Sequence, residues 1–275
     1  MSKEIKKIRK FHKGKISINE LNAIQTSYSD KLSFKHFLTY LGIPAAIFAV
    51  FTHIIFFNYF LTLATMCFGL LYGLLKHLPN MVKKNHYHKS YIERNRFINN
   101  CTNLIGNEHV SFLSILEKLI PRLNGELYND ITVLLAKLTS ANKELAEKAF
   151  DEIVKKYEED VIFGQFFEQL ETAHLEGRPN IETFKELKEQ HNAFILQQDE
   201  FQVEKGTFIT TVMVTAFLVL IIIGLLVFSY SIEIYLDAYA YTTIGMIFNS
   251  LFLVLIYLFF NRTMNFLYDD SLTTF

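Results

Sequence analysis

Three long stretches without charge dominate the pattern of this chain. They lie between Lys35 and Lys76, between Lys205 and Glu233, and between Asp237 and Arg262. A helix needs about 20 apolar residues to cross roughly 30 Å of hydrocarbon, because each residue advances it by about 1.5 Å. The pattern therefore predicts membrane-spanning helices.

We expect about four crossings in an all-α membrane protein. Phe208–Phe228 and Ala240–Phe260 each fit one crossing. Phe37–Leu75 is too long for one ordinary crossing and suits two short helices, with a turn near Thr52–Asn58. This stretch is therefore interpreted as a tight helical hairpin.

A charged segment of helical character separates the second crossing from the third. Its apolar residues recur at spacings of three and four, which places each set on one helix face that must be buried. The sets are Phe112, Ile115, Leu116, Leu119, Ile120 and Leu123; Ala146, Phe150, Ile153, Val154 and Tyr157; and Phe163, Phe166, Phe167 and Leu170. No alternating strand pattern occurs, so we expect a helical bundle.

Turn residues divide this segment into about six helices. The breaks fall at Gly106-Asn107, Asn124-Gly125, Thr139-Ser140 and Gly177–Asn180, where glycine permits left-handed turns and polar side chains can cap the next helix. No proline or other stop occurs between Ile181 and the third crossing. We expect one helix to run through this region into the membrane.

Basic residues set the expected orientation, because Lys and Arg accumulate on the cytoplasmic side of crossings. Residues 1–36 carry many cations, and another group follows the hairpin at Lys76–Arg96. The loop after the third crossing holds only Glu233 and Asp237. The pattern predicts a multi-pass protein with both termini and the large insert in the cytoplasm.

These interpretations divide the chain into seven segments. They are a basic cytoplasmic arm (1–36), the transmembrane hairpin (37–76), the cytoplasmic bundle (77–206), transmembrane helix 3 (207–229), an external loop (230–239), transmembrane helix 4 (240–261) and a cytoplasmic tail (262–275). The arm precedes a crossing, which favours attraction to anionic lipid over nucleic acid. The insert is mildly acidic, which also argues against nucleic acid.

Motifs of catalysis and cofactor binding are absent from the sequence. It contains no Walker A loop, GxGxxG, HExxH or GxSxG. Glu158-Glu159-Asp160 could hold a divalent cation, but a solvated helix start is favoured, since acidic residues suit the positive end of the helix dipole. His77, His86 and His88 are a weak metal candidate. We therefore assign no catalytic, cofactor or metal residue.

The arrangement resembles the platform proteins of type II secretion and type IV pilus machines, in the single-module form of Tad-type pili. The likeness covers roughly residues 40–260 and rests on architecture and loose apolar spacing. Leu74–Pro79, followed by Lys83-Lys84 and Arg94–Arg96, resembles the short basic helix after the membrane hairpin. The helix pair Phe112–Leu138, which turns at Asn124-Gly125, resembles the family's first cytoplasmic hairpin. The segment Phe166–Glu171, continuing through Glu176-Gly177 to Ile181 and Leu187, resembles its acidic segment and glycine turn ahead of the long helix. Gly106–His109 departs from the small-residue turn usual in the family.

The resemblance implies a non-enzymatic assembly platform without cofactors. It implies a location in a bacterial plasma membrane, with a cytoplasmic secretion ATPase and pilin-like or secreted substrates as partners besides the lipid bilayer. It also implies a homo-oligomer, or a hetero-oligomer with a sister platform protein. The partner-binding candidates on the acidic segment are Glu168, Glu171, Glu176 and Gly177. The alternative is a membrane-anchored receptor or scaffold whose helical domain binds an unrelated partner.

Overall fold

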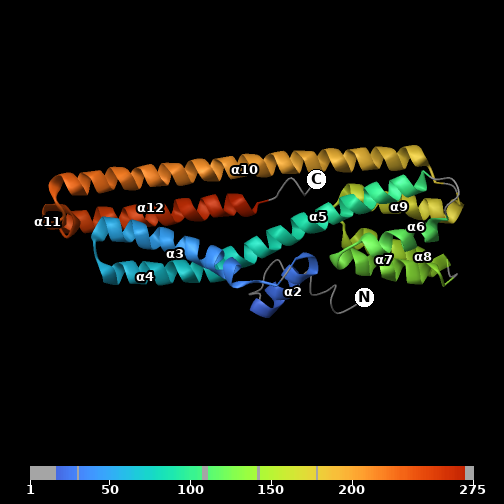
Figure 1. Ribbon diagram of the computed structural model, residues 1–275, viewed down its shortest axis with the longest axis horizontal. Coiled ribbons are helices and arrows are strands. Elements are labelled where there is room, and N and C mark those ends of the chain that lie inside the picture. Colours follow the sequence, from blue (N-terminus) through green and yellow to red (C-terminus); the bar gives the residue numbers. More distant parts are fainter. Residues whose placement is uncertain (1–16, 30, 107–110, 141–142, 178, 270–275) are drawn as a thin grey trace. The chain divides into compact units, whose positions relative to one another are not determined.

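The computed structural model describes residues 17–29, 31–106, 111–140, 143–177 and 179–269 (Figure 1). Nearly all of these residues are helical, and no strand occurs among them. The prediction of an all-α protein is confirmed.

The chain divides into two compact units. The polar unit comprises Lys84–Glu200 with the described residues up to Lys31. The apolar unit comprises Leu32–Lys83 with the described residues from Phe201 onward. Each unit contains its own packing contacts.

In the part of the chain that the structure describes, four helical runs are long and apolar enough to cross a membrane: Phe34–Phe56, Tyr59–Ile105, Ile181–Tyr230 and Thr243–Tyr268. This number agrees with the expected four crossings and indicates a membrane protein. Within such a span the backbone must satisfy its own hydrogen bonds, which is why the apolar stretches are helices.

The hairpin turns where the sequence predicts. Helix α3 (Phe34–Phe56) is followed by Phe57, which has a left-handed backbone, and α4 (Tyr59–Tyr72) begins after Asn58. The Asn58 side chain accepts hydrogen bonds from the backbone N–H groups of Phe60 and Leu61, which have no partner within α4, and so caps that helix.

Glycines let the two helices of the hairpin approach at backbone distance. A Cβ added at Gly69 would lie 2.6 Å from the Cα of Ala45, and one at Gly73 would lie 2.8 Å from the Cα of Leu41. Only a residue without a side chain fits at these two positions, as in other close contacts between membrane helices.

The second helix of the hairpin does not end at residue 76, where the charge pattern set the boundary. A π-helical turn, η2 (Gly73–His77), joins α4 to α5 (Leu78–Ile105), so one helical run extends from Tyr59 to Ile105. Pro79 lacks an N–H and its ring would collide with a carbonyl of an ordinary preceding turn. The wider π turn just before it provides the room.

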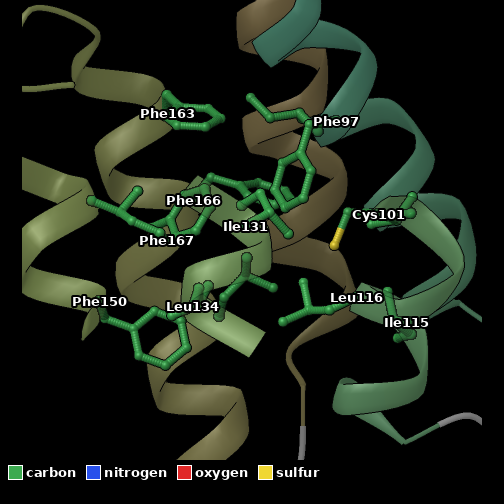
Figure 2. Close-up of a cluster of buried hydrophobic side chains, with 14 of the residues drawn as sticks. Phe97, Cys101, Ile115, Leu116, Ile131, Leu134, Phe150, Phe163, Phe166 and Phe167 are labelled. Atoms are coloured by element: carbon green, nitrogen blue, oxygen red, sulfur yellow. The ribbon is translucent and has the colours of Figure 1, made fainter. Parts of the chain in front are cut away.

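Among the described residues of the polar unit, six α-helices and one 3-10 turn surround one core. They are α5, α6 (Phe112–Leu119), the 3-10 turn η3 (Ile120–Arg122), α7 (Gly125–Leu138), α8 (Lys143–Lys156), α9 (Val161–Glu176) and the start of α10 (Ile181–Tyr230). Figure 2 shows Phe97, Phe150 and Phe167 among the core side chains that converge there. All three predicted apolar faces line this core, or pack against it when partly buried.

Helix boundaries follow the predicted turn residues. Asn124 precedes α7 and Gly125 has φ +65°, while α9 ends at Gly177, which has φ +71°. Asn107 and Arg178, which also belong to predicted breaks, lie outside the described residues. The six α-helices from α5 to α10 agree with the expected number for the part of this segment that the structure describes.

Part of the expected basic arm is a folded helix. α2 (Ile18–Tyr28) starts with a capping box between Ser17 and Glu20 and belongs to the polar unit. Its Tyr28 lies against Gly125, where an added Cβ would come within 2.2 Å of the ring. The cations of residues 1–16, on which the lipid prediction for the arm mainly rests, lie outside the described residues.

The long helix is continuous as predicted. α10 spans 50 residues without interruption (Figure 1, yellow to orange). After it, the loop contains the short α11 (Ile232–Tyr235) and the π turn η4 (Leu236–Ala240), and α12 (Thr243–Tyr268) extends beyond the predicted boundary at residue 261.

Phe150→Asp tests the core of the polar unit. The Phe150 side chain is 0% exposed, so a carboxylate there would be buried among apolar neighbours and should cost several kcal/mol, on the order of 3–5. Thermal unfolding of the purified protein in detergent measures the loss. Lys148→Glu, two residues away on the exposed side of α8, is the control. Equal midpoints for the two variants would contradict the packing.

Candidate functional site

Polar side chains join α5 to α10 inside the polar unit. Asn99 and Asn192 exchange a reciprocal pair of amide hydrogen bonds of 2.9 and 3.1 Å. One turn away, the Nδ1 of His191 lies 2.9 Å from the Oδ1 of Asn95. These contacts fix the position of α10 along α5, because each polar group needs its hydrogen-bond partner once it is removed from water.

A buried ionic cluster adds a third helix to this junction. Arg94 of α5 donates through Nε to Oδ2 of Asp160 at 2.7 Å, and Nε2 of His191 lies 3.3 Å from the same oxygen. The other carboxylate oxygen of Asp160 accepts from the backbone N–H of Phe163 and so caps α9. Asp160 thereby connects α5, α9 and α10 at one carboxylate.

Aromatic rings surround the cations of the cluster. Tyr91 stacks on His191 with ring centroids 4.7 Å apart and an interplanar angle of 13°. The Arg94 guanidinium lies 5.1 Å from the centroid of Tyr91 and 5.2 Å from that of Tyr157. Arginine tolerates such surroundings because its flat, weakly hydrated guanidinium interacts favourably with ring faces.

The partners of Asp160 keep its carboxylate ionised despite burial. Burial by itself raises the pKa of this carboxyl, but the His191 hydrogen bond and the Arg94 charge outweigh it, so the pKa lies below its usual value. Asp160 and His191 side chains are 4% and 0% exposed. The cluster is therefore closed to a substrate, and its geometry supports holding helices together rather than catalysis.

A second charged group ties α5, α7 and α8 near the surface. Glu126 faces His86 at 3.3 Å and Lys156 at 3.7 Å, and the His86 contact is the main reason that the pKa of Glu126 lies below its usual value. Lys156 also pairs with Asp130, which accepts a 2.7 Å hydrogen bond from Tyr157. Two ionic groups thus fix the relative positions of the helices in the polar unit.

The predicted partner-binding residues lie on α9 and at its end. Glu168, Glu176 and Gly177 are exposed, while Glu171 is half-buried. Gly177 ends the helix in the left-handed conformation that favours glycine.

Glu168 and Glu171 belong to a wider acidic surface formed with α8. Partial burial of Glu171, followed by the charges of Asp151, Glu147 and Glu168, raises the pKa of its carboxyl. We call these four residues the acidic surface. Glu176 and Gly177, at the end of α9, are not part of it.

The structure corrects the interpretation of Glu158-Glu159-Asp160 as a solvated helix start. Glu158 and Glu159 are exposed, as expected for a solvated helix start, but Asp160 is buried in the ionic cluster. Its partners are Arg94 and His191, not solvent. In the part of the chain that the structure describes, no three His, Cys, Asp or Glu side chains are grouped to hold a metal ion.

Sequence reasoning missed the ionic cluster. Its one local signal is His191, which follows Phe184 and Leu187 at spacings of three and four and so continues the buried face of α10. A polar residue on such a face needs a buried partner, but that partner lies 31 positions away in Asp160. No local pattern identifies it.

Comparison with known proteins supplies a family but no activity. No family model matches the chain, and no solved structure matches it. The chain is 32% identical over 257 residues to the uncharacterized protein pXO2-23 of Bacillus anthracis, covering 94% of this chain and 93% of that protein. It belongs to the family of this protein. The match covers nearly the whole length, so the family shares residues of both units.

Asp160→Asn tests the ionic cluster through its pH dependence. Because the folded pKa of Asp160 is depressed, its stabilising contribution is present above the unfolded value of about 3.9 and is lost as pH falls through the folded pKa. At neutral pH the variant leaves Arg94 without its carboxylate and should lose about 3–5 kcal/mol. The gap in thermal midpoint between wild type and variant should narrow on acidification below about pH 4.

Asp151→Asn is the matched control, since Asp151 is exposed and pairs only loosely with Lys155, at 3.7 Å. It should lower the midpoint little at any pH, as exposed pairs contribute at most about 1 kcal/mol. A gap for Asp160→Asn that stays constant from neutral to acid pH would contradict the assigned role of its charge.

Proposed function

We propose that this protein is a non-enzymatic inner-membrane platform of a pilus-assembly or type II-like secretion machine, which couples a cytoplasmic ATPase to movement of pilin or substrate. The observation that carries the proposal is the unbroken α10. Its first turns belong to the core of the polar unit through Phe184 and Leu187, and its later part is a candidate membrane span. A single stiff element of this kind can carry displacement from a soluble unit into a bilayer.

The ionic cluster supports this role. A partner that moves the polar unit moves α10 only if the helix cannot slip within that unit. His191 lies inside the unit at 0% exposure, held by Asp160 and Asn95, and Asn192 is bonded to Asn99. Breaking a buried ionic pair costs about 3–5 kcal/mol, so the junction resists sliding.

The positive-inside pattern supports a cytoplasmic location for the polar unit and both termini. Lys and Arg crowd the ends of the crossings on that side, whereas the loop between the last two crossings carries only acidic charge. We place the protein in a bacterial plasma membrane on this basis and on its resemblance to secretion platforms.

The acidic surface is the proposed contact for the ATPase. Its four carboxylates present concentrated negative charge on α8 and α9, which favours a basic partner patch and speeds encounter. Glu176 and Gly177 at the end of α9 extend the candidate contact along that helix. Pilin-like or secreted substrates and a sister platform protein complete the proposed machine.

Cysteine labelling tests the orientation. In a Cys67→Ser background, a cysteine at Ser231 should react with a membrane-impermeant maleimide added to intact cells, and one at Ser140 should react only after lysis. Both positions are exposed, so burial does not limit either reaction. Labelling of position 140 in intact cells would overturn the proposed topology.

Two variants separate ATPase binding from force transmission. Glu168→Lys with Glu171→Lys should prevent co-purification of the ATPase, because it reverses half of the acidic surface. Glu200→Pro should leave ATPase binding intact but abolish export, because proline removes a helix N–H and clashes with the preceding turn, at a cost of about 3 kcal/mol or more. Mass spectrometry of the affinity-purified complex identifies the partners, and the exported protein is then quantified outside the cells.

Glu189→Lys and Glu200→Ala are the controls, each changing an exposed carboxylate on α10 without breaking the helix. Both should retain partners and export. Absence of any ATPase or pilin-like protein from the wild-type complex would favour a membrane-anchored receptor or scaffold. Normal export by Glu200→Pro at normal protein level would show that α10 does not transmit the motion.

A further inference from the structure

A cluster of hydrogen-bond donors lies where the end of α4 and the π turn η2 meet α12 within the apolar unit. The Oδ1 of Asn261 accepts a 3.1 Å hydrogen bond from the Tyr72 hydroxyl and a second one from the ammonium of Lys76. That ammonium also lies 5.8 Å from the centroid of the Tyr72 ring. Beside them, Nδ1 of His77 contacts the hydroxyl of Tyr268.

The donors of this cluster exceed its acceptors. An ammonium has three N–H donors and an amide nitrogen has two. Among the described residues, Lys76 meets only the Asn261 oxygen, which accepts from both neighbours, and the Asn261 nitrogen meets no acceptor. No described carboxylate pairs with Lys76. Lys76 and Asn261 are both half-exposed, so the remaining donors can reach an external acceptor.

The cluster lies where two apolar stretches end together. Lys76 is the first charged residue after the long uncharged stretch of the hairpin, and Arg262, next to Asn261, is the first after the uncharged stretch of α12. Since Lys76 bonds Asn261, both stretches reach their first cation at the same level of the apolar unit. Cations and tyrosines at the ends of membrane helices mark the depth of lipid headgroups.

The neighbouring surface suits an acyl chain. Leu71 of α4 and Leu75 of η2 precede Lys76 and are 56% and 66% exposed. One turn of helix thus places exposed leucines on the hydrocarbon side, and on the headgroup side an ammonium that pairs with no described carboxylate. A ligand that satisfies both needs an anionic, acceptor-rich group attached to hydrocarbon.

We propose that Lys76 and Asn261 bind the headgroup phosphate of an anionic phospholipid, using the membrane placement that the candidate spans indicate. The phosphate oxygens accept from the Lys76 ammonium and the Asn261 amide nitrogen, and the negative charge of the lipid balances Lys76. The π turn Gly73–His77 sets both Lys76 and His77 at this level. This binding does not depend on the proposed platform function.

Lipid retention by the full-length protein tests the site. The protein is reconstituted in nanodiscs of phosphatidylcholine containing phosphatidylglycerol, re-extracted in mild detergent, and its retained lipids are counted by native mass spectrometry. Lys76→Gln and Asn261→Asp should each lower phosphatidylglycerol retention roughly five-fold, which is what about 1 kcal/mol per cation at a membrane surface amounts to. In Asn261→Asp the new carboxylate pairs with Lys76 and removes the amide donors.

Lys76→Arg should keep retention, since it preserves charge and donors. Lys35→Gln removes an exposed cation of α3 from the same unit and should also keep retention. If Lys76→Gln fails to fold, the comparison of Asn261→Asp with Lys76→Arg decides the question. Size-exclusion profiles and thermal midpoints report folding of each variant.

Three results would overturn the proposal. An equal loss in Lys35→Gln would mean diffuse attraction to an anionic surface. Equal retention of phosphatidylcholine would remove the role of lipid charge. Displacement of phosphatidylglycerol by excess inorganic phosphate in the wild type, to the level of Lys76→Gln, would identify free phosphate as the ligand instead.

Discussion

The demand that backbone hydrogen bonds be satisfied without water governs the rest of this structure. Inside hydrocarbon only a helix meets that demand within one segment, so each uncharged stretch of the chain is helical. α10 is a helix over its apolar half for this reason and over its first half because Phe184, Leu187 and His191 face a core. Two different constraints thus act on one continuous element.

A continuous helix can transmit displacement only if its ends are held in place. In the polar unit the anchor is the Asp160 carboxylate, which meets Arg94, His191 and the start of α9 at once. A buried ionic group of this kind is costly to form and costly to break, so it stabilises little net and specifies position strongly. That property fits a junction whose purpose is to keep α5 and α10 in register.

Both sites proposed for this protein are charged surfaces. The acidic surface gathers four carboxylates on α8 and α9, and no described carboxylate pairs with the ammonium of Lys76. Uncompensated charge is where a partner contributes most, through attraction and through hydrogen bonds that water otherwise makes. The two sites would serve different partners, a basic protein surface and an anionic lipid.

The sequence alone determined the secondary structure, the number of candidate crossings and the buried helix faces. These depend on composition and on spacings of three and four, which are local, and so the turn at Phe57-Asn58 and the continuity of α10 could both be predicted. Only the tertiary structure decided that α4 continues through a π turn into α5, and that α2 packs against Gly125. It likewise decided that Asp160 is buried with Arg94 and His191, and that Lys76 meets Asn261 across 185 positions. The reason is physical: the fate of a charged side chain depends on partners distant in sequence, and local pattern carries no record of which distant group will lie beside it.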